Sequence, residues 1–131
     1  MKKFLKVILD ILLYIWQLPQ NLIGLVVRLI YPGCEKVNIA GVDVYYNKKF
    51  PGGISLGNTI VVGSKWPETI LHEHGHQIQS LYLGPLYLFV IGIPSIVWAG
   101  LYGNIIPYTH NGYYKFYTES WADKLGGVIR N

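Results

Sequence analysis

The chain has 131 residues, of which 51% are hydrophobic and 14% are charged, and its formal net charge is +4. A chain of this length fits one domain, and a typical soluble domain carries about 25% charged residues, so the composition excludes an ordinary charge-covered surface. The Lys and Arg residues are scattered without interleaved aromatic residues, which excludes nucleic acid and favours anionic lipid headgroups as partners. Cys34 is the single cysteine, so no intrachain disulfide forms.

Residues 1–31 are expected to form a membrane-associated, helical N-terminal segment. Lys6, Asp10, Pro19 and Arg28 interrupt an otherwise apolar block. The uncharged stretch 11–27 lies at the low edge of the length that spans a bilayer, so one span, two interfacial helices and a shallow hairpin all fit. Because Asp10 breaks the run and no small-residue cleavage site follows, we expect a retained anchor and an integral membrane location.

Residues 32–131 are expected to form the core of the domain. Residues 37–39 and 42–45 alternate apolar and polar side chains around Ala40-Gly41, which predicts a hairpin. Residues 54–62 predict a third strand of an antiparallel sheet, with a bulge or bend at Gly57-Asn58. Helices are predicted over about 67–82, stopped by Gly84-Pro85, and over about 113–125, ended by Gly126-Gly127. An uncharged apolar insertion, 86–106, lies between these helices.

The pentapeptide His72-Glu73-His74-Gly75-His76 matches the H-E-x-x-H zinc motif. Residues four apart share one face of a helix, so His72 and His76 can both direct a ring nitrogen at one ion. Glu73 can then reach a water on the zinc without being a ligand, and it is predicted to act as general base. His74 lies about 200° round the helix from His72 and is expected to point away.

A catalytic zinc usually has three protein ligands, so a third must come from elsewhere in the chain. Glu119 is the best candidate, because Asp123 lies four residues further on the same helix face and can bind the far nitrogen of a liganding histidine. His110 is the alternative, as in zincins with three histidine ligands. The metzincin pattern fails, because its third histidine would fall at Tyr82.

H-E-x-G-H followed by E-x-x-A-D resembles the gluzincins, and among them the M48-type membrane zinc peptidases, the group of CAAX-processing and heat-shock proteases. The matching residues are His72, Glu73, Gly75, His76, Glu119, Ala122 and Asp123. The resemblance implies zinc bound by His72, His76 and Glu119, with Glu73 as general base. It also implies that Asp123 accepts a hydrogen bond from a liganding histidine. The site-2 proteases also use H-E-x-G-H, but their later Asp-Gly ligand motif has no counterpart here.

The expected fold class is α+β: a minimal zincin-like core, with a small antiparallel sheet, the H-E-x-x-H helix and a Glu-bearing helix, joined to apolar membrane-associated helices. In zincin-like folds an edge strand beside the zinc helix pairs with an extended peptide, and 54–62 is the candidate strand here. Four side chains close to Glu119 in the sequence are candidate oxyanion stabilisers: His110, Tyr113, Tyr114 and Tyr117.

The function predicted from these motifs is a membrane-associated zinc peptidase acting on peptides or proteins. The alternative is a non-enzymatic membrane protein or complex subunit whose zinc is structural, with four protein ligands. The low charge content is also compatible with an oligomer or a membrane-protein partner.

The insertion 86–106 resembles a transmembrane helix in its hydropathy, yet we predict that it does not cross the bilayer as one span. His72, His76 and Glu119 flank it on both sides, and one crossing would place roughly 30 Å of hydrocarbon between them. Pro94 near its middle also disfavours a continuous helix. A re-entrant hairpin or a buried helix pair under the zinc site is therefore expected.

Overall fold

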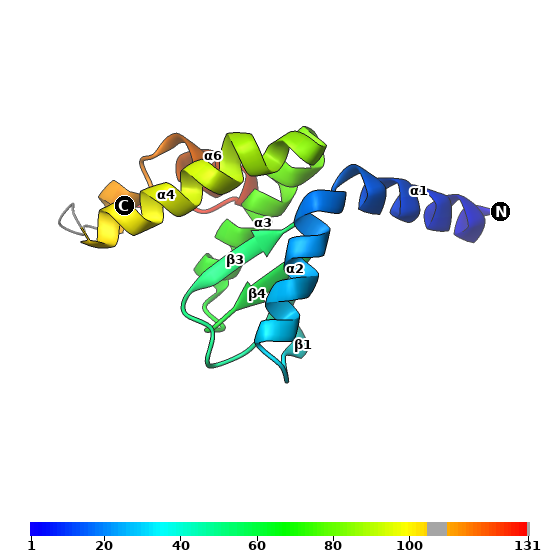
Figure 1. The fold of residues 1–131 in the computed structure, drawn as a ribbon, viewed down its shortest axis with the longest axis horizontal. Coiled ribbons are helices and arrows are strands. Elements are labelled where there is room, and N and C mark those ends of the chain that lie inside the picture. The colour runs from blue at the N-terminus through cyan, green and yellow to red at the C-terminus, as the bar shows by residue number, and fades with distance from the viewer. Residues whose placement is uncertain (105–109, 131) are drawn as a thin grey trace.

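Helices pack against both faces of a small four-stranded sheet in the computed structural model, which describes residues 1–104 and 110–130 (Figure 1). The fold is α+β, as expected from the sequence. The sheet is mixed, however, and its strand order is β1-β2-β4-β3.

Two N-terminal helices, α1 (Lys2–Trp16) and α2 (Leu18–Ile30), meet at a bend of 85°. Helix α1 buries none of its residues and extends away from the rest of the molecule (Figure 1). The chain has two separate helices here, and their arrangement relative to a bilayer stays a prediction. Within the described residues no single helix meets the length and hydropathy of a membrane span, although the bent α1–α2 pair does so when taken together.

The first hairpin is confirmed: β1 (Glu35–Ile39) pairs antiparallel with β2 (Val42–Tyr46). Both residues of its turn, Ala40 and Gly41, have positive φ, as in the turns that match the twist of a hairpin. The single strand predicted over 54–62 is wrong. It is a second hairpin, in which β3 (Gly53–Leu56) and β4 (Thr59–Val62) pair antiparallel around Gly57-Asn58.

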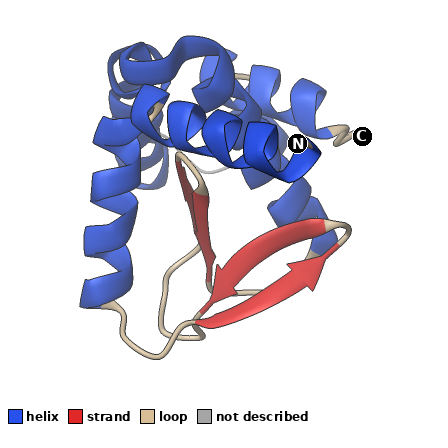
Figure 2. Ribbon diagram, turned by 90° about the vertical axis from the view of Figure 1, so that its right-hand side faces the viewer, coloured by secondary structure: helices blue, strands red, loops and turns tan. Residues whose placement is uncertain are grey.

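The predicted antiparallel sheet is also wrong, because β4 pairs parallel with β2. This pairing places the second hairpin alongside the first, so that β4 is interior and β3 is an edge strand. Figure 2 shows the strands gathered beneath the helices. The turn of the second hairpin rests on α2, where Asn21 Oδ1 accepts a hydrogen bond from the Asn58 N–H (2.7 Å).

The hydrophobic core lies between the sheet and α3 (Pro67–Leu83). Ile70 of α3 packs against four buried side chains on one face of the sheet: Val42, Val44, Ile60 and Val62. Helix α2 covers the opposite face, where Gly24 approaches Thr59 and Leu56. Side chains alternate between the two faces of a strand, so the neighbours Thr59 and Ile60 contact different helices.

The described part of the insertion after α3, residues 86–104, forms one helical stretch, so both predicted forms, the re-entrant hairpin and the buried helix pair, are wrong. A short 3-10 turn η1 (Gly84–Leu86) and a π-helical turn η2 (Leu88–Gly92) lead into α4 (Ile93–Asn104). Pro94 is accommodated because it falls in the first turn of α4, where its missing N–H costs little. The irregular hydrogen bonding of η2 immediately precedes it.

The last predicted helix is divided in two. Tyr113 belongs to a short helix α5 (His110–Tyr113), and α6 (Tyr117–Gly126) begins four residues later than Tyr113. The predicted end is confirmed: Gly127 is left-handed, and the Val128 N–H donates to the Asp123 carbonyl (2.8 Å), which closes the helix in a Schellman arrangement.

Helices α3 and α6 approach each other at backbone contact. A Cβ on Gly75 of α3 would lie 1.8 Å from the Ala122 carbonyl oxygen, and one on Gly126 would lie 2.0 Å from the Leu71 carbonyl oxygen. Neither neighbour is the flexible end of a side chain, so these two glycines permit the approach. This close approach of the two helices brings residues 72–76 of α3 next to residues 119–123 of α6.

We therefore predict that Gly75→Ala destabilises the fold by about 1–3 kcal/mol, because the new methyl group forces α3 and α6 apart. Thermal unfolding in detergent would measure the effect. Gly100→Ala on α4 is the matched control, since a Cβ there meets nothing within 4 Å. Equal destabilisation by the two substitutions would contradict the role of the helix contact.

Candidate metal centre

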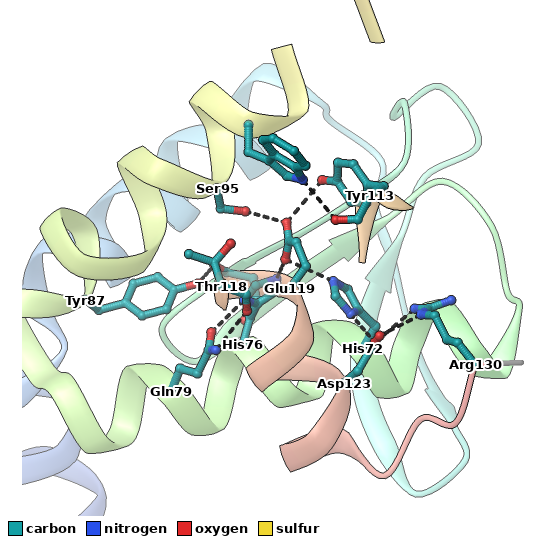
Figure 3. A network of polar contacts seen from close by, with 12 residues as sticks. His72, His76, Gln79, Tyr87, Ser95, Tyr113, Thr118, Glu119, Asp123 and Arg130 are labelled. Carbon is teal, nitrogen blue, oxygen red and sulfur yellow. Dashed lines mark hydrogen bonds and ion pairs between the residues drawn. The ribbon is translucent and has the colours of Figure 1, made fainter. Parts of the chain in front are cut away.

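Three buried side chains converge where α3 faces α6. His72 and His76 lie four residues apart on α3, and Glu119 projects from the first turn of α6 (Figure 3). The ligand atoms of this group lie within 4.8 Å of one another, so together they could hold a metal ion. The structure thus brings together the three residues that the sequence named as ligands.

The distances within the group fit one small ion. Glu119 Oε2 lies 3.4 Å from His72 Nε2 and 2.7 Å from His76 Nε2. Two ligands of a tetrahedral zinc, each at about 2.0–2.1 Å, lie about 3.3 Å apart. The first distance already matches this spacing, and the second needs only a small side-chain movement.

Hydrogen bonds on the far side of each imidazole ring fix which nitrogen carries the proton. His72 Nδ1 lies 2.6 Å from Asp123 Oδ1, a carboxylate that can only accept, so Nδ1 donates. Gln79 donates its Nε2 to the Thr118 carbonyl (3.0 Å), which turns its Oε1 toward His76 Nδ1 at 2.7 Å. Both neutral rings therefore present an unprotonated Nε2 to Glu119.

The carboxylate of Glu119 is bound asymmetrically. Its Oε1 accepts hydrogen bonds from Ser95 Oγ (2.7 Å) and Tyr113 OH (3.1 Å). Its Oε2 is buried and faces the two imidazole Nε2 atoms, and while both rings are neutral it has no hydrogen-bond donor within the described residues. Three electron pairs, two from imidazole and one from carboxylate, therefore point at one place with no donor between them. Such an arrangement is stabilised by a cation.

Without a metal, a proton can fill this role. Burial lowers the pKa of His72, but hydrogen bonds to Asp123 and Glu119 outweigh burial and raise that pKa to about 9. Burial raises the pKa of Glu119, yet hydrogen bonds from His72 and His76 outweigh it, so the net pKa is lowered. Since metal ligands must be deprotonated, a bound ion replaces this proton.

Asp123 is itself held by the C-terminal segment. Arg130 donates from Nε to Asp123 Oδ2 (2.6 Å) and from Nη2 to Oδ1 (3.0 Å), and it also pairs with Glu68 of α3. The guanidinium lies 3.3 Å from the centre of the Tyr114 ring, and this ring forms a T-shaped contact with the His72 imidazole. Arg130 therefore fixes both outer neighbours of His72.

Glu73 lies beside the three ligands without belonging to the group. Its side chain rests against Gly53 of β3, where a Cβ would meet Glu73 Oε1 at 3.2 Å. Burial raises the pKa of Glu73, while the imidazoles of His76 and His72 lower it, and burial dominates. A carboxylate with a raised pKa accepts a proton more readily at neutral pH.

A cavity of about 640 Å³ opens over Glu73 and the three ligands. Edge strand β3 and helices α2, α3 and α4 contribute to its walls, and most of the lining surface is apolar. Tyr87 also lines it and donates its hydroxyl to the Ser55 carbonyl (3.2 Å). The cavity therefore has a polar floor of histidine and glutamate under apolar walls.

The remaining predicted site residues are distributed as follows. His74 is outside the metal group, as predicted, and its Nδ1 lies 3.0 Å from Gln77 Oε1. Tyr113 and Tyr114 both line the cavity. Tyr117 is exposed and donates its hydroxyl to the Val90 carbonyl, away from the ligands. The side chain of His110, the alternative ligand and oxyanion candidate, lies outside the described residues.

Three contributors were not predicted from the sequence: Gln79, Ser95 and Arg130. Gln79 could have been found, because it lies one turn after His76 on the same helix face. Ser95 reaches Glu119 from α4, and Arg130 returns to Asp123 after the end of α6. Tertiary packing alone determines these two contacts, so no local sequence signal marks them.

Comparison with protein-family models, curated proteins and solved structures finds no match to this chain.

We predict that Glu119→Ala and His76→Ala each reduce Zn²⁺ affinity by more than the roughly 10–100-fold that loss of an outer partner costs. Competition with a chelating dye would measure this. His74→Ala is the matched control, since His74 lies on the same helix but outside the group. The Zn²⁺ affinity of this variant should be unchanged. Normal Zn²⁺ binding by Glu119→Ala would show that α6 supplies no ligand.

A smaller effect is expected for Asp123→Ala. This change removes the acceptor that orients His72 but leaves all three ligand atoms, so Zn²⁺ affinity should fall by about 10–100-fold. The same dye competition, with Lys124→Ala as an exposed neighbouring control, would measure it. A loss as large as that of Glu119→Ala would instead indicate that Asp123 is needed for the ligand group to form.

Proposed function

We propose that this chain is a membrane-associated zinc peptidase of the gluzincin type. Zinc is held by His72, His76 and Glu119, and Glu73 is the general base. The observation that carries the proposal is the convergence of three buried ligand atoms, from His72, His76 and Glu119, beside the non-liganding carboxylate of Glu73 at the floor of a cavity.

The donor set favours zinc in a catalytic role. Two imidazoles and one carboxylate make up the ligands of many hydrolytic zinc sites, which keep a fourth position for water. A structural zinc site would close that position with a fourth side chain. Among the described residues the group contains three members and no fourth histidine, cysteine or acid. This supports hydrolysis over the alternative of a purely structural zinc.

Zinc would polarise the scissile carbonyl and lower the pKa of a water to roughly 7. Glu73 would accept a proton from the attacking water as the water oxygen bonds to the carbonyl carbon. The same carboxyl group then gives the proton to the amide nitrogen as the C–N bond breaks, so the products are a carboxylic acid and an amine. Asp123 and Gln79 keep the two imidazoles in the tautomer that binds metal.

The edge strand β3 favours a peptide over other hydrolysable substrates. The Gly63 N–H donates to the Gly52 carbonyl (2.8 Å), and the register then pairs Ile54 with Val61 through hydrogen bonds. The N–H and C=O groups of Gly53 and Ser55 consequently point to the free edge. Tyr87 binds the Ser55 carbonyl, so Gly53, directly beside Glu73, offers a donor and an acceptor to an extended peptide.

Tyr113 is the best placed of the candidate oxyanion stabilisers whose side chains are described. Its hydroxyl lies at the ligand carboxylate, 3.1 Å from Glu119 Oε1, and it lines the cavity. Burial, and then the charge of Glu119, raise its pKa, so the phenol stays protonated at neutral pH. By turning from Glu119 Oε1, the protonated phenol can donate its one hydrogen to the negative charge developing on the carbonyl oxygen.

Glu73→Gln tests the proposal most directly. The isosteric amide cannot accept a proton, so peptide hydrolysis should fall by at least about 100-fold, the contribution of general base catalysis. Bound Zn²⁺ should stay at one equivalent, because Glu73 is not a ligand. Cleavage of a fluorogenic peptide library and metal analysis of the same samples would check both. Retained hydrolysis, or lost zinc, would contradict the assigned role.

A further inference from the structure

Helix α2 has the reverse polarity of a helix in a water-soluble protein. The residues that it buries are Gln20, Asn21 and Gly24. Its exposed face carries large apolar side chains: Leu18, Leu22, Ile23, Leu25, Val26, Leu29 and Ile30. A helix at a water interface buries the apolar face and exposes the polar one. The exposed face of α2 therefore requires an apolar surrounding.

Specific hydrogen bonds prevent α2 from rotating that face inward. Gln20 Nε2 donates to Ser80 Oγ and to the Gly84 carbonyl, both at 2.8 Å. Asn21 donates to the Tyr14 carbonyl (2.9 Å) and accepts from the Asn58 N–H (2.7 Å). These bonds tie the polar face of α2 to α3 and to the second hairpin. Rotation of α2 would therefore leave several buried polar groups without hydrogen-bond partners.

Helix α4 and the turns before it present a second apolar face. Residues 84–104 contain no charged residue. Exposed apolar side chains follow one another along this stretch: Leu86, Phe89, Val90, Ile93, Ile96, Val97 and Leu101. Monomeric soluble proteins rarely expose contiguous apolar patches of this kind without a partner.

The cavity above the metal centre connects the two apolar faces. Ile23 of α2 and Ile93 and Ile96 of α4 all line the cavity, and they are 42%, 54% and 64% exposed. The same side chains thus belong both to the outer surface and to the cavity wall. The cavity opens between α2 and α4, on the apolar surface.

We propose that the α2 and α4 faces lie in the hydrocarbon of a bilayer, and that the substrate is an apolar peptide segment entering the cavity from the lipid. This rests on the proposed peptidase function. A bilayer is favoured over a second copy because α1 buries nothing, exposes apolar side chains and extends away from the body. Lys2 and Lys3, exposed at its start, suit anionic headgroups.

The position of the surface can be measured with single cysteines in a Cys34→Ser background, labelled with an environment-sensitive fluorophore. Val26 and Val97 are exposed on the two apolar faces outside the cavity, and Lys48 is an exposed control beside the sheet. In phosphatidylcholine–phosphatidylglycerol vesicles, brominated lipid should quench the labels at 26 and 97 but not at 48. Quenching at none of them, with a dimer in detergent, would assign the surface to a second copy.

The substrate class is tested with two vesicle-anchored peptides that share one apolar cleavable core. In the first the core lies in the bilayer, and in the second a charged Gly/Ser spacer holds it in water. Both are concentrated on the same membrane, so a preference of at least about tenfold for the first cannot arise from co-localisation. Ile96→Asn should reduce cleavage of the immersed core and Ile96→Leu should restore it, with zinc retained by both.

Failure of substrate access from the lipid and failure of the peptidase function would give different results. Equal cleavage of the immersed and the water-held core would overturn access from the lipid and leave the peptidase function standing. Zinc-loaded protein that cleaves neither of these peptides nor any soluble peptide would overturn the peptidase function itself. In that case the fluorophore experiment still decides whether the apolar surface lies in lipid.

Discussion

The backbone contact between α3 and α6 is the constraint on which the metal centre depends. Glu119 can reach His72 and His76 only because Gly75 lets the Ala122 carbonyl approach the H-E-x-x-H helix where a side chain would stand. Metal coordination tolerates deviations of about 0.2 Å, whereas one methyl group displaces a helix by more than that. The glycine of the motif therefore sets the separation between its two histidines and the third ligand.

The close contact between α3 and α6 buries charge and lone pairs together, which lowers the folding stability. An unsatisfied buried acceptor costs about 1–3 kcal/mol, and Glu119 Oε2 is such an acceptor within the described residues. The surrounding groups do not relieve it: Ser95 and Tyr113 bind only Oε1, and Asp123 and Gln79 turn the imidazole N–H groups outward. Only a proton or a metal ion removes the conflict, so a metal ion bound at this candidate site would also stabilise the fold.

The sequence predicted those parts of the site that follow from local spacing. Residues four apart on one helix specify His72 with His76, and Glu119 with Asp123, whatever the rest of the chain does. Parallel pairing of β2 with β4 depends on contacts between segments that no local pattern records. Gly57-Asn58 suits a bulge and a hairpin turn equally well, and its contact with Asn21 of α2 accompanies the turn seen here. Ser95 and Arg130 reach the site only through such tertiary contacts.

The cavity is lined by residues of two kinds, which bears on the proposed hydrolysis of a substrate that enters from lipid. Ile23 and Ile96 form the apolar rim between α2 and α4, while Gly52, Ser64 and Thr69 line the cavity near the sheet and the start of α3. Hydrolysis consumes water, which an apolar mouth does not supply. These polar residues belong to other segments than the apolar faces of α2 and α4, so in the proposed reaction they would give water a route to Glu73 beside a bound apolar segment. A chain with few charged residues can therefore still hold a polar site that water reaches.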